Sequence, residues 1–317
     1  MPDATATALM TREAHRAALA VAGGELRQAG DEHVLLSRPG TGTLLVTFDT
    51  LDAARARPGG LPIGAGLAQA HDWATLDVLA DGQTWFRCDV LHDRFDALAD
   101  QGMFDAFERV VFAGGGIGGY GAAAFSVASP GATVLAVQPR ATLARDIAPW
   151  EQRFRDAWAL DWSGRYGDAS RLVEAAGRVY VVTDPGEPAD AMHASLFRGP
   201  HVTHLPAPQG GRDLLGRIER SGILDHLIAD AADGVLDPAR FAQLWRARRR
   251  DPGWLTSLLR AAEHRDRPFL AAIVAGRAVA EGRGTAAARR LDAALSRLAE
   301  RGQPPPRGVA ADVKAEG

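Results

Sequence analysis

Apolar residues along the chain fall into short runs bounded by turn residues, and this pattern predicts seven strands. The runs are 33–40, 43–50, 73–81, 109–114, 132–139, 178–185 and 201–208. Between them, after residue 50, lie amphipathic or alanine-rich stretches of helical length at 91–107, 117–129, 142–158 and 187–198. This alternation predicts an α/β fold of three layers, in which helices cover both faces of a mostly parallel sheet.

The first two predicted strands differ from the others because only a Pro-Gly-Thr-Gly turn separates them. So short a connection has no room for a crossover helix. We therefore predict that 33–40 and 43–50 pair as an antiparallel hairpin, which gives the sheet an antiparallel start. A plain dinucleotide-binding domain is not usually laid out in this way.

The strand pattern ends near residue 213, and five helical stretches follow. They cover 214–231, 237–250, 252–265, 267–282 and 285–302. Pro238, Pro252 and Pro268 fall where prolines occur in the first turn of a helix, and the five stretches are expected to stack as helical hairpins.

Three regions result from this reading of the pattern. Residues 1–213 are predicted to form the α/β domain, with an N-terminal helix at 12–22. Residues 214–302 are predicted to form a helical extension, and 303–317 a flexible tail. If Trp245, Trp254 and Phe269 were exposed, the extension would offer anchors for a protein partner; we expect them instead to pack the hairpins together.

Composition narrows the chemistry that the chain can perform. Of the 317 residues, 46% are hydrophobic and the net charge is −3, as in ordinary globular proteins. Cys88 is the single cysteine, which excludes an internal disulfide and a cysteine-based metal centre. Lys314 is the single lysine and lies in the predicted tail, so a phosphate-binding lysine loop and Schiff-base chemistry are not expected.

The expected surroundings of the protein are aqueous. The N-terminus lacks the basic and apolar segments of a signal peptide, and no apolar run is long enough to span a bilayer, so we expect a cytoplasmic protein without membrane contact. The arginines at 246–250 are interpreted as a solvated helix face rather than a nucleic-acid site. No metal or cofactor is expected.

The stretch VVFAGGGIGGYGAAAF at 110–125 joins a predicted strand to a predicted helix through a glycine-rich turn. In one interpretation Gly114, Gly116 and Gly119 form the G-x-G-x-x-G fingerprint of a dinucleotide site. That motif is usually completed by an acidic residue about 20 residues further on, where this chain has Gln138 and Arg140. Arg140 would then meet the 2′-phosphate of NADP.

In the other interpretation, residues 114–118 form a nucleophile elbow, a strained strand-to-helix turn flanked by small residues. Gly116 then occupies the position of the nucleophile, so the serine is missing. In chain order the acid comes next, and Asp184 at the end of the run 178–185 fills that position, with Asp190 as a second candidate.

The histidine position of the same motif falls in Gly210-Gly211-Arg212-Asp213. Arg212 stands there, and a guanidinium cannot act as a base near neutral pH. His193 is the remaining candidate base. A hydrolase or transferase without a serine nucleophile would have to use Asp184 or Asp190 together with His193.

On the elbow GGGIGGYGAAAF, the acid position and the GGRD loop, residues 33–213 resemble the α/β-hydrolases. The resemblance implies the α/β-hydrolase fold, with a pocket at the carboxyl ends of the strands. Two of the three catalytic groups that it implies are missing here, at Gly116 and Arg212.

A second resemblance covers most of the chain. The segments LLVTFD, LPIGAGLAQAHDWATLDVLADGQTWFR, ATVLAVQPRATL and DAMHASLFRGPHVTHLPAP, with the helical region, are similar to a group of alphaproteobacterial proteins often named phosphoadenosine phosphosulfate reductase. The reductases proper work through a cysteine near the C-terminus, and the last hundred residues of this chain contain none. We therefore do not expect sulfonucleotide reduction.

The pocket implied by the fold is expected to remain without the catalytic groups. Its predicted lining is Phe48, Asp49, Trp85, Ile117, Gly118 and Arg212. Because the free N–H groups at a helix N-terminus attract anions, the expected ligand is a small, anionic molecule. The sequence leaves four hypotheses: a pseudo-hydrolase with a binding pocket, a hydrolase or transferase without serine, an NADP-type binding protein, and a helical scaffold for a protein partner.

Overall fold

The computed structural model describes residues 19, 24–282 and 284–309 and divides the chain into two compact units, 1–245 and 246–317. Of the predicted N-terminal helix at 12–22, only Leu19 is described, and it packs in a small apolar cluster with Leu51 and Leu79. Lys314 lies outside the described residues.

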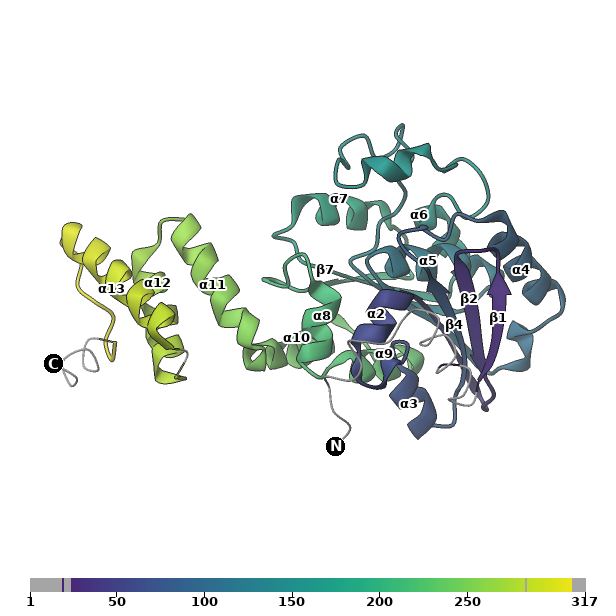
Figure 1. Ribbon diagram of the computed structural model, residues 1–317, viewed down its shortest axis with the longest axis horizontal. Coiled ribbons are helices and arrows are strands. Elements are labelled where there is room, and N and C mark those ends of the chain that lie inside the picture. Colours follow the sequence, from purple (N-terminus) through teal and green to yellow (C-terminus); the bar gives the residue numbers. More distant parts are fainter. Residues whose placement is uncertain (1–18, 20–23, 283, 310–317) are drawn as a thin grey trace. The chain divides into compact units, whose positions relative to one another are not determined.

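An eight-stranded sheet forms the centre of the first unit (Figure 1). The strands are β1 (Glu25–Ala29), β2 (His33–Arg38), β3 (Thr43–Thr50), β4 (Ala74–Ala80), β5 (Arg109–Gly115), β6 (Thr133–Val137), β7 (Arg178–Thr183) and β8 (Val202–Pro206). Their order in the sheet is β1-β2-β4-β3-β5-β6-β7-β8. Only the pairs β1–β2 and β2–β4 are antiparallel, so the predicted fold class, a mostly parallel α/β-hydrolase-like sheet with an antiparallel start, is confirmed.

The predicted hairpin between the first two runs was wrong, because β4 lies between β2 and β3 and pairs with both. The short connection passes directly over the beginning of β4. A Cβ atom on Gly40 would lie 2.2 Å from the carbonyl carbon of Trp73, and the Thr41 N–H donates to the Asp72 carbonyl at 2.7 Å. Glycine at position 40 therefore lets the chain step across one strand within four residues, and the antiparallel partners of β2 are β4 and β1, a strand that the pattern missed.

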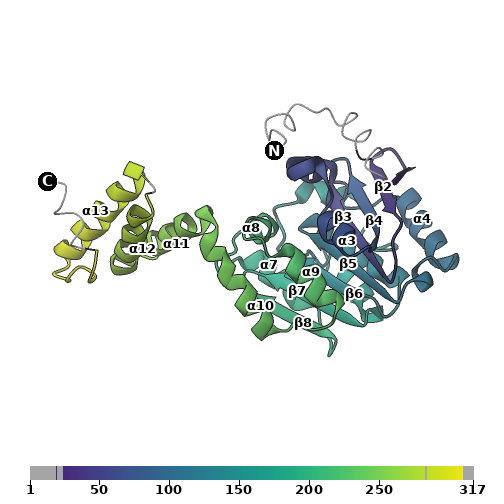
Figure 2. The ribbon, with the colours of Figure 1, turned by 90° about the horizontal axis from the view of Figure 1, so that it is seen from below.

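Helices cover both faces of the sheet. They are α2 (Leu51–Ala56), α3 (Ala65–Ala70), α4 (Asp89–Asp100), α5 (Ile117–Phe125), α6 (Ala169–Leu172), α7 (Pro188–Leu196), α8 (Leu214–Arg220), α9 (Leu224–Ala232) and α10 (Pro238–Trp245). Helix α5 packs on β3, β5 and β6, above a core that includes Phe48 and Phe112. Helix α9 packs on β5 and β6, which completes the three layers (Figure 2).

One predicted helix, 142–158, did not form. The structure has only a 3₁₀ turn at Arg155–Ala159 in this segment. Pro149 interrupts the stretch, and the buried Glu151 bonds to His193 on α7 and to Arg153 rather than facing solvent on a helix. The alanines that made the stretch look helical are buried against the core as irregular backbone.

The first unit extends beyond the predicted boundary at residue 213, because α8 to α10 belong to it. Apolar residues of α9, Leu227 and Ile228, are buried where that helix packs on the sheet, and Trp245 of α10 donates its indole N–H to the Pro208 carbonyl at 3.3 Å. These helices cover a sheet face rather than forming hairpins of their own.

The second unit is a separate helical bundle. It consists of a 3₁₀ turn at Arg246–Arg250, α11 (Pro252–His264), α12 (Pro268–Ala280) and α13 (Gly284–Glu300). Leu255, Leu259 and Leu291 form its core together with Trp254, while Phe269 is 44% exposed. As predicted, Pro238, Pro252 and Pro268 are the first residues of their helices. Among the described residues, no helix has the length and apolar character needed to cross a bilayer.

Close contact between α5 and the sheet depends on glycine. A Cβ atom on Gly118 would lie 2.0 Å from the carbonyl oxygen of Phe48, and one on Gly114 would lie 2.2 Å from the carbonyl oxygen of Gly118. Because these neighbours are backbone atoms, one in β3 and one in α5, neither clash can be relieved by a rotamer change.

We predict that Gly118→Ala destabilises the protein by about 3 kcal/mol or more, because the added methyl group forces α5 away from β3. The matched control is Gly66→Ala in α3, where nothing lies within 4 Å of the added Cβ. That change should stabilise the fold by roughly 0.5–1 kcal/mol, through the lower entropy of the unfolded chain. Equilibrium urea unfolding measures both. Equal stability of the two variants would contradict the packing described here.

Candidate functional site

The turn between β5 and α5 consists of one residue, Gly116. Its backbone has φ 61° and ψ −117°, in the region that residues with a side chain rarely adopt. Its N–H donates to the Val137 carbonyl of β6 at 2.9 Å, which fixes the turn to the neighbouring strand. A Cβ atom here would point into open space, and the nearest atom, Nη1 of Arg140, would be 4.0 Å away. The turn thus has a backbone conformation that would strain a residue with a side chain, and glycine adopts it.

A cleft of about 470 Å³ opens at this turn, at the carboxyl ends of the strands. Of the residues predicted to line it, Asp49, Ile117 and Arg212 do so, and Gly116 and Arg140 lie beside them. Phe48 and Trp85, in contrast, lie in the hydrophobic core with side chains at most 1% exposed. Gly118 is buried against Phe48, so the predicted lining was too large by these three residues.

Trp85 is in the core because the segment after β4, to which it belongs, packs against the segment that follows β6. The Trp85 ring packs edge to face on Phe154 and Trp162, with ring centroids 5.0 and 5.8 Å apart. Its φ of 56°, followed by 54° at Phe86, directs both aromatic side chains inward. Of this cluster, Phe154 reaches the wall of the cleft.

Arg140 is the buried cation of the site, with 7% of the residue exposed. Nη1 donates to the Gln138 carbonyl at 2.6 Å, and Nη2 lies 3.3 Å from Oδ1 of Asp190. The guanidinium also stacks over the Phe154 ring at 5.1 Å. Burial lowers the pKa of Arg140, and Asp190 only partly offsets this. Its Nε is buried and has no hydrogen-bond partner among the described residues, so the cation is under-solvated.

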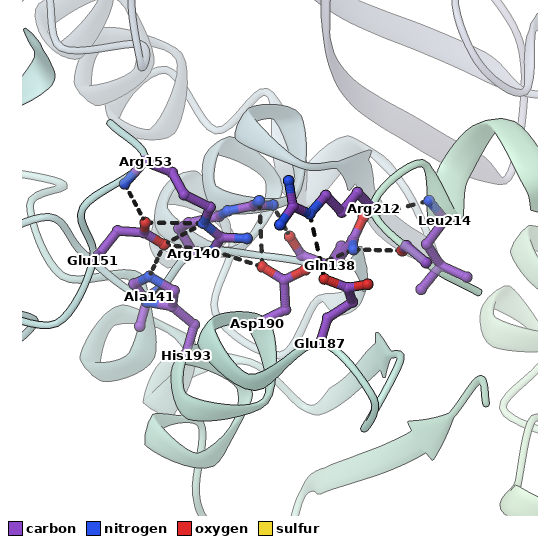
Figure 3. A network of polar contacts seen from close by, with 11 residues as sticks. Gln138, Arg140, Ala141, Glu151, Arg153, Glu187, Asp190, His193, Arg212 and Leu214 are labelled. Carbon is purple, nitrogen blue, oxygen red and sulfur yellow. Dashed lines mark hydrogen bonds and ion pairs between the residues drawn. The ribbon is translucent and has the colours of Figure 1, made fainter. Parts of the chain in front are cut away.

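Asp190 and His193, on α7, belong to a buried network next to the cleft (Figure 3). Asp190 accepts from the Gln138 amide at 2.7 Å and pairs with Arg153 at 2.7 Å. His193 Nδ1 accepts the Ala141 N–H at 3.3 Å, so Nε2 carries the proton and donates to Glu151 at 3.2 Å. With both ring nitrogens engaged and the residue fully buried, His193 has no free position at which to take a proton from a substrate.

Asp184 and Arg212, the predicted acid and the residue in the histidine position, do not contact each other. The Asp184 carboxylate accepts the Gly186 N–H at 2.9 Å and the Gly211 N–H at 2.8 Å. It therefore anchors the loop of Arg212 through that loop's backbone. The Arg212 side chain is 82% exposed and lies 3.5 Å from Glu187 (Figure 3).

Gln138 was missed as a site residue by sequence reasoning. It follows β6 with φ 53°, and its side-chain amide donates to Asp190 and to the Gly211 carbonyl at 2.9 Å, while its Oε1 accepts the Leu214 N–H at 3.4 Å. The signal was available, since Gln138 stands where the dinucleotide motif calls for an acid. Glu151 and Arg153, also missed, lie in the segment predicted to be helical.

The backbone N–H of Thr50, the last residue of β3, already forms a hydrogen bond. In α/β-hydrolases an N–H from the loop after this strand is expected to complete the oxyanion hole. Here the Thr50 N–H donates to the carboxylate of Asp49 at 2.8 Å, and Asp49 pairs with Arg57, which also binds Glu219. Burial raises the pKa of Asp49, and Arg57 opposes that shift. The Ile117 N–H, at the start of α5, is then the backbone donor that faces Gly116.

The glycines of the dinucleotide motif have different surroundings. Gly114 packs against Gly118, and a Cβ on Gly119 would lie 2.9 Å from the Val137 carbonyl oxygen, so both serve helix-to-strand contact. Only Gly116 of the three lines the cleft. Among residues 19, 24–282 and 284–309, no group of His, Cys, Asp and Glu side chains is arranged to hold a metal ion.

No protein-family model and no curated protein matches the sequence. Solved structures similar in fold include an esterase from the hyperthermophilic archaeon Pyrobaculum calidifontis, with 14% identity, a TM-score of 0.44, and coverage of 73% of this chain and 94% of that chain. Carboxyl esterase 2 of the fungus Tuber melanosporum has 12% identity and a TM-score of 0.41 over 66% of this chain and 87% of that one. A capsule O-acetyltransferase of Neisseria meningitidis has 11% identity and a TM-score of 0.38 over 62% and 92%. At this level of similarity no functional conclusion follows.

We predict that Glu151→Gln weakens the acid sensitivity of the fold. Burial opposes ionisation of Glu151, but hydrogen bonds from Arg153 and His193 outweigh it and hold its pKa well below the ordinary 4.5. Folding therefore favours the carboxylate, and the resulting stability is present above pH 4.5 and is lost as the pH falls. At pH 7 the variant should be less stable by about 1–3 kcal/mol, because Arg153 loses a charged partner.

The difference in the free energy of unfolding between the wild type and Glu151→Gln should shrink at pH 3, where the Glu151 carboxyl of the unfolded wild-type chain is protonated. Urea midpoints at the two pH values measure it, with the exposed Glu174→Gln as control, which should follow the wild type at both. A deficit of the same size at pH 7 and pH 3 would rule out the linkage.

Proposed function

We propose that the protein is a pseudo-hydrolase: an α/β-hydrolase fold that binds a small anionic molecule at its elbow instead of cleaving an ester. The observation that carries this proposal is the geometry of Gly116. The turn keeps the backbone conformation of a nucleophile elbow, and its open face meets a buried arginine rather than a serine and a histidine.

Acyl transfer through a covalent intermediate needs a nucleophile and a base within hydrogen-bond reach. At position 116, glycine has no side chain and so supplies no nucleophilic atom. Arg212 cannot accept a proton and is turned towards Glu187, and His193 is enclosed by Ala141 and Glu151. A reaction through Asp184 or Asp190 finds little support either, because hydrogen bonds and ion pairs already engage both carboxylates.

Binding of an anion is supported by two kinds of donor. The first N–H groups of α5 have no partner within the helix, and they carry the positive end of its dipole. Arg140 adds a cation whose Nη1 would lie 4.0 Å from a Cβ at Gly116 and whose Nε is unpartnered. An anionic group placed above Gly116 would bond to the Ile117 N–H. It would also stabilise the charge of Arg140, because this guanidinium is buried and little of it is exposed to solvent.

The other hypotheses have less support in this geometry. NADP binding through the glycine turn requires all three glycines to admit a pyrophosphate, whereas Gly114 and Gly119 are in close contact with backbone atoms of α5 and β6. For a partner-binding helical region, two of the three predicted anchors, Trp245 and Trp254, are buried, and Phe269 is the one of the three that is exposed. For sulfonucleotide reduction the single cysteine, Cys88, caps the start of α4 and is not among the residues that line the cleft.

We predict that simple oxyanions, tested as acetate, sulfate and phosphate, bind the wild type and that Ile117→Pro weakens the best of them at least about tenfold. Proline is tolerated at the first position of a helix and removes the N–H, together with part of the Ile117 side chain that packs on the core, and one hydrogen bond to a charged group is worth about 1.5–3 kcal/mol. Isothermal titration calorimetry measures the affinities.

Arg140→Gln should weaken the same anion at least as strongly, and Arg171→Gln serves as the charge-matched control because Arg171 is exposed and outside this cleft. The folded state of each variant is checked by its melting temperature. Absence of binding for all three anions, or equal loss with Arg171→Gln, would end the proposal.

We further predict no turnover of p-nitrophenyl acetate by the wild type above the uncatalysed rate, because no activated nucleophile is present. The double variant Gly116→Ser/Arg212→His should release a burst of p-nitrophenol, with the space above residue 116 admitting the serine and Asp184 holding the histidine loop. Each single variant should stay silent. Wild-type turnover that Asp184→Ala abolishes would overturn the pseudoenzyme assignment.

A further inference from the structure

Charge is distributed very unevenly between the two units. Residues 246–317 hold 15 of the 36 basic residues and 8 of the 39 acidic residues, which gives them a formal charge of +7. Residues 1–245 carry −10. The near-neutral total of −3 hides this separation, and a strongly basic small unit attracts anions.

Within the second unit, three arginines face one cavity of about 390 Å³. Arg267 precedes α12, and Arg290 and Arg297 lie two turns apart on one side of α13. The remaining lining consists of Glu263 and small residues: Pro268, Ala271, Ala293 and Ala294. Ala271 and Ala294 are buried where α12 and α13 pack together, and above them the exposed Arg267 and Arg297 and the half-buried Arg290 border a hollow that is open to solvent.

The charges around this hollow are not balanced. Glu263 pairs with Arg290 through both carboxylate oxygens, with Oε1 at 2.9 Å from Nε. Neither Arg267 nor Arg297 forms an ion pair with a carboxylate in the part of the chain that the structure describes. The nearby Asp266 is bound by Arg301 at 2.6 Å, and it is not among the lining residues. The three lining arginines thus share one lining carboxylate, Glu263, and Arg297 also lies within electrostatic reach of Asp266, which leaves the cavity with a net positive charge.

We propose that this cavity binds a small molecule that carries a phosphate group. Guanidinium groups match phosphate oxygens with paired N–H donors. A carboxylate has two oxygens and occupies one guanidinium, whereas a phosphate offers three terminal oxygens and up to two negative charges, which fits three arginines. Arg290, held in place by Glu263, serves as the fixed donor, and Arg267 before α12 and Arg297 on α13 supply the other donors.

The volume agrees with this assignment. Cavities that hold small molecules usually measure about 300–1,000 Å³, so 390 Å³ admits a phosphate group with a compact substituent. The alanines and proline of the lining give such a substituent an apolar surface. This site lies wholly in the second unit and does not depend on the elbow cleft or on its proposed ligand.

The test is calorimetric titration of the full chain with pyrophosphate, at low ionic strength. We expect saturable binding that Arg297→Ala weakens at least about tenfold, because a charge-assisted hydrogen bond is worth more than the 1.4 kcal/mol of one decade. The matched control is Arg289→Ala, which removes the same charge from an exposed position on the same helix, outside the cavity lining. It should leave the affinity within about twofold, since a surface charge beyond the site is screened by solvent.

Two further arms locate the site and identify the chemistry. Binding should persist in Ile117→Pro, which separates this cavity from the elbow, and citrate should bind more weakly than pyrophosphate. The proposal is overturned by the absence of binding, by its loss in Ile117→Pro, by equal losses in the Arg289 and Arg297 variants, or by tighter binding of citrate.

Discussion

The contact between α5 and the carboxyl end of β3 is the constraint on which the site depends. Gly118 lies so close to the Phe48 carbonyl that no side chain fits between them, and this places the start of the helix directly over the sheet. The chain then has a single residue, Gly116, in which to reverse from strand to helix. Its backbone must adopt a conformation that costs other residues about 1–3 kcal/mol, and glycine adopts it without that strain. The cleft, the free helix N–H groups and the approach to Arg140 all follow from this turn.

Buried charge determines the shape of the rest of the site. Arg140, Arg153, Asp190 and Glu151 neutralise one another in a layer beside the elbow, and each is held by further hydrogen bonds. Removing a partner from such a layer leaves an uncompensated charge, which costs far more than the pair itself contributes. The segment after β6 therefore has one arrangement, fixed by side chains, although it lacks regular helix. This rigidity keeps the Arg140 guanidinium close to Gly116 without a bound ligand.

Sequence periodicity identified seven of the eight strands and the helix that follows the elbow, because both are encoded by residues close together in the chain. It also placed Gly116 in the turn between a strand and a helix and Asp184 at the end of a strand, where the structure has them. It could not show that β4 inserts between β2 and β3, since that pairing depends on contacts between strands far apart in sequence and on the glycine that lets the chain cross over. The same limit explains Trp85, whose burial requires Phe154 and Trp162, and the end of the first unit at Trp245, which depends on the sheet that α9 and α10 cover.

A serine and a glycine at the elbow position give the same turn different properties. In a hydrolase the strained turn exposes a hydroxyl to its base, and the cost in stability is tolerated for the sake of chemistry. With glycine the turn is relaxed, its Cβ position is empty, and a ligand atom can approach the backbone N–H groups more closely than a side chain would permit. Next to Gly116, Arg140 and the start of α5 donate hydrogen bonds, while the carboxylates that line the cleft, Asp49, Asp52 and Asp213, lie at the end of β3, in α2 and directly before α8. A site of this kind would stabilise a negative charge that the ligand already has, rather than create one on a substrate, and this is the physical reason for which we propose binding in place of catalysis.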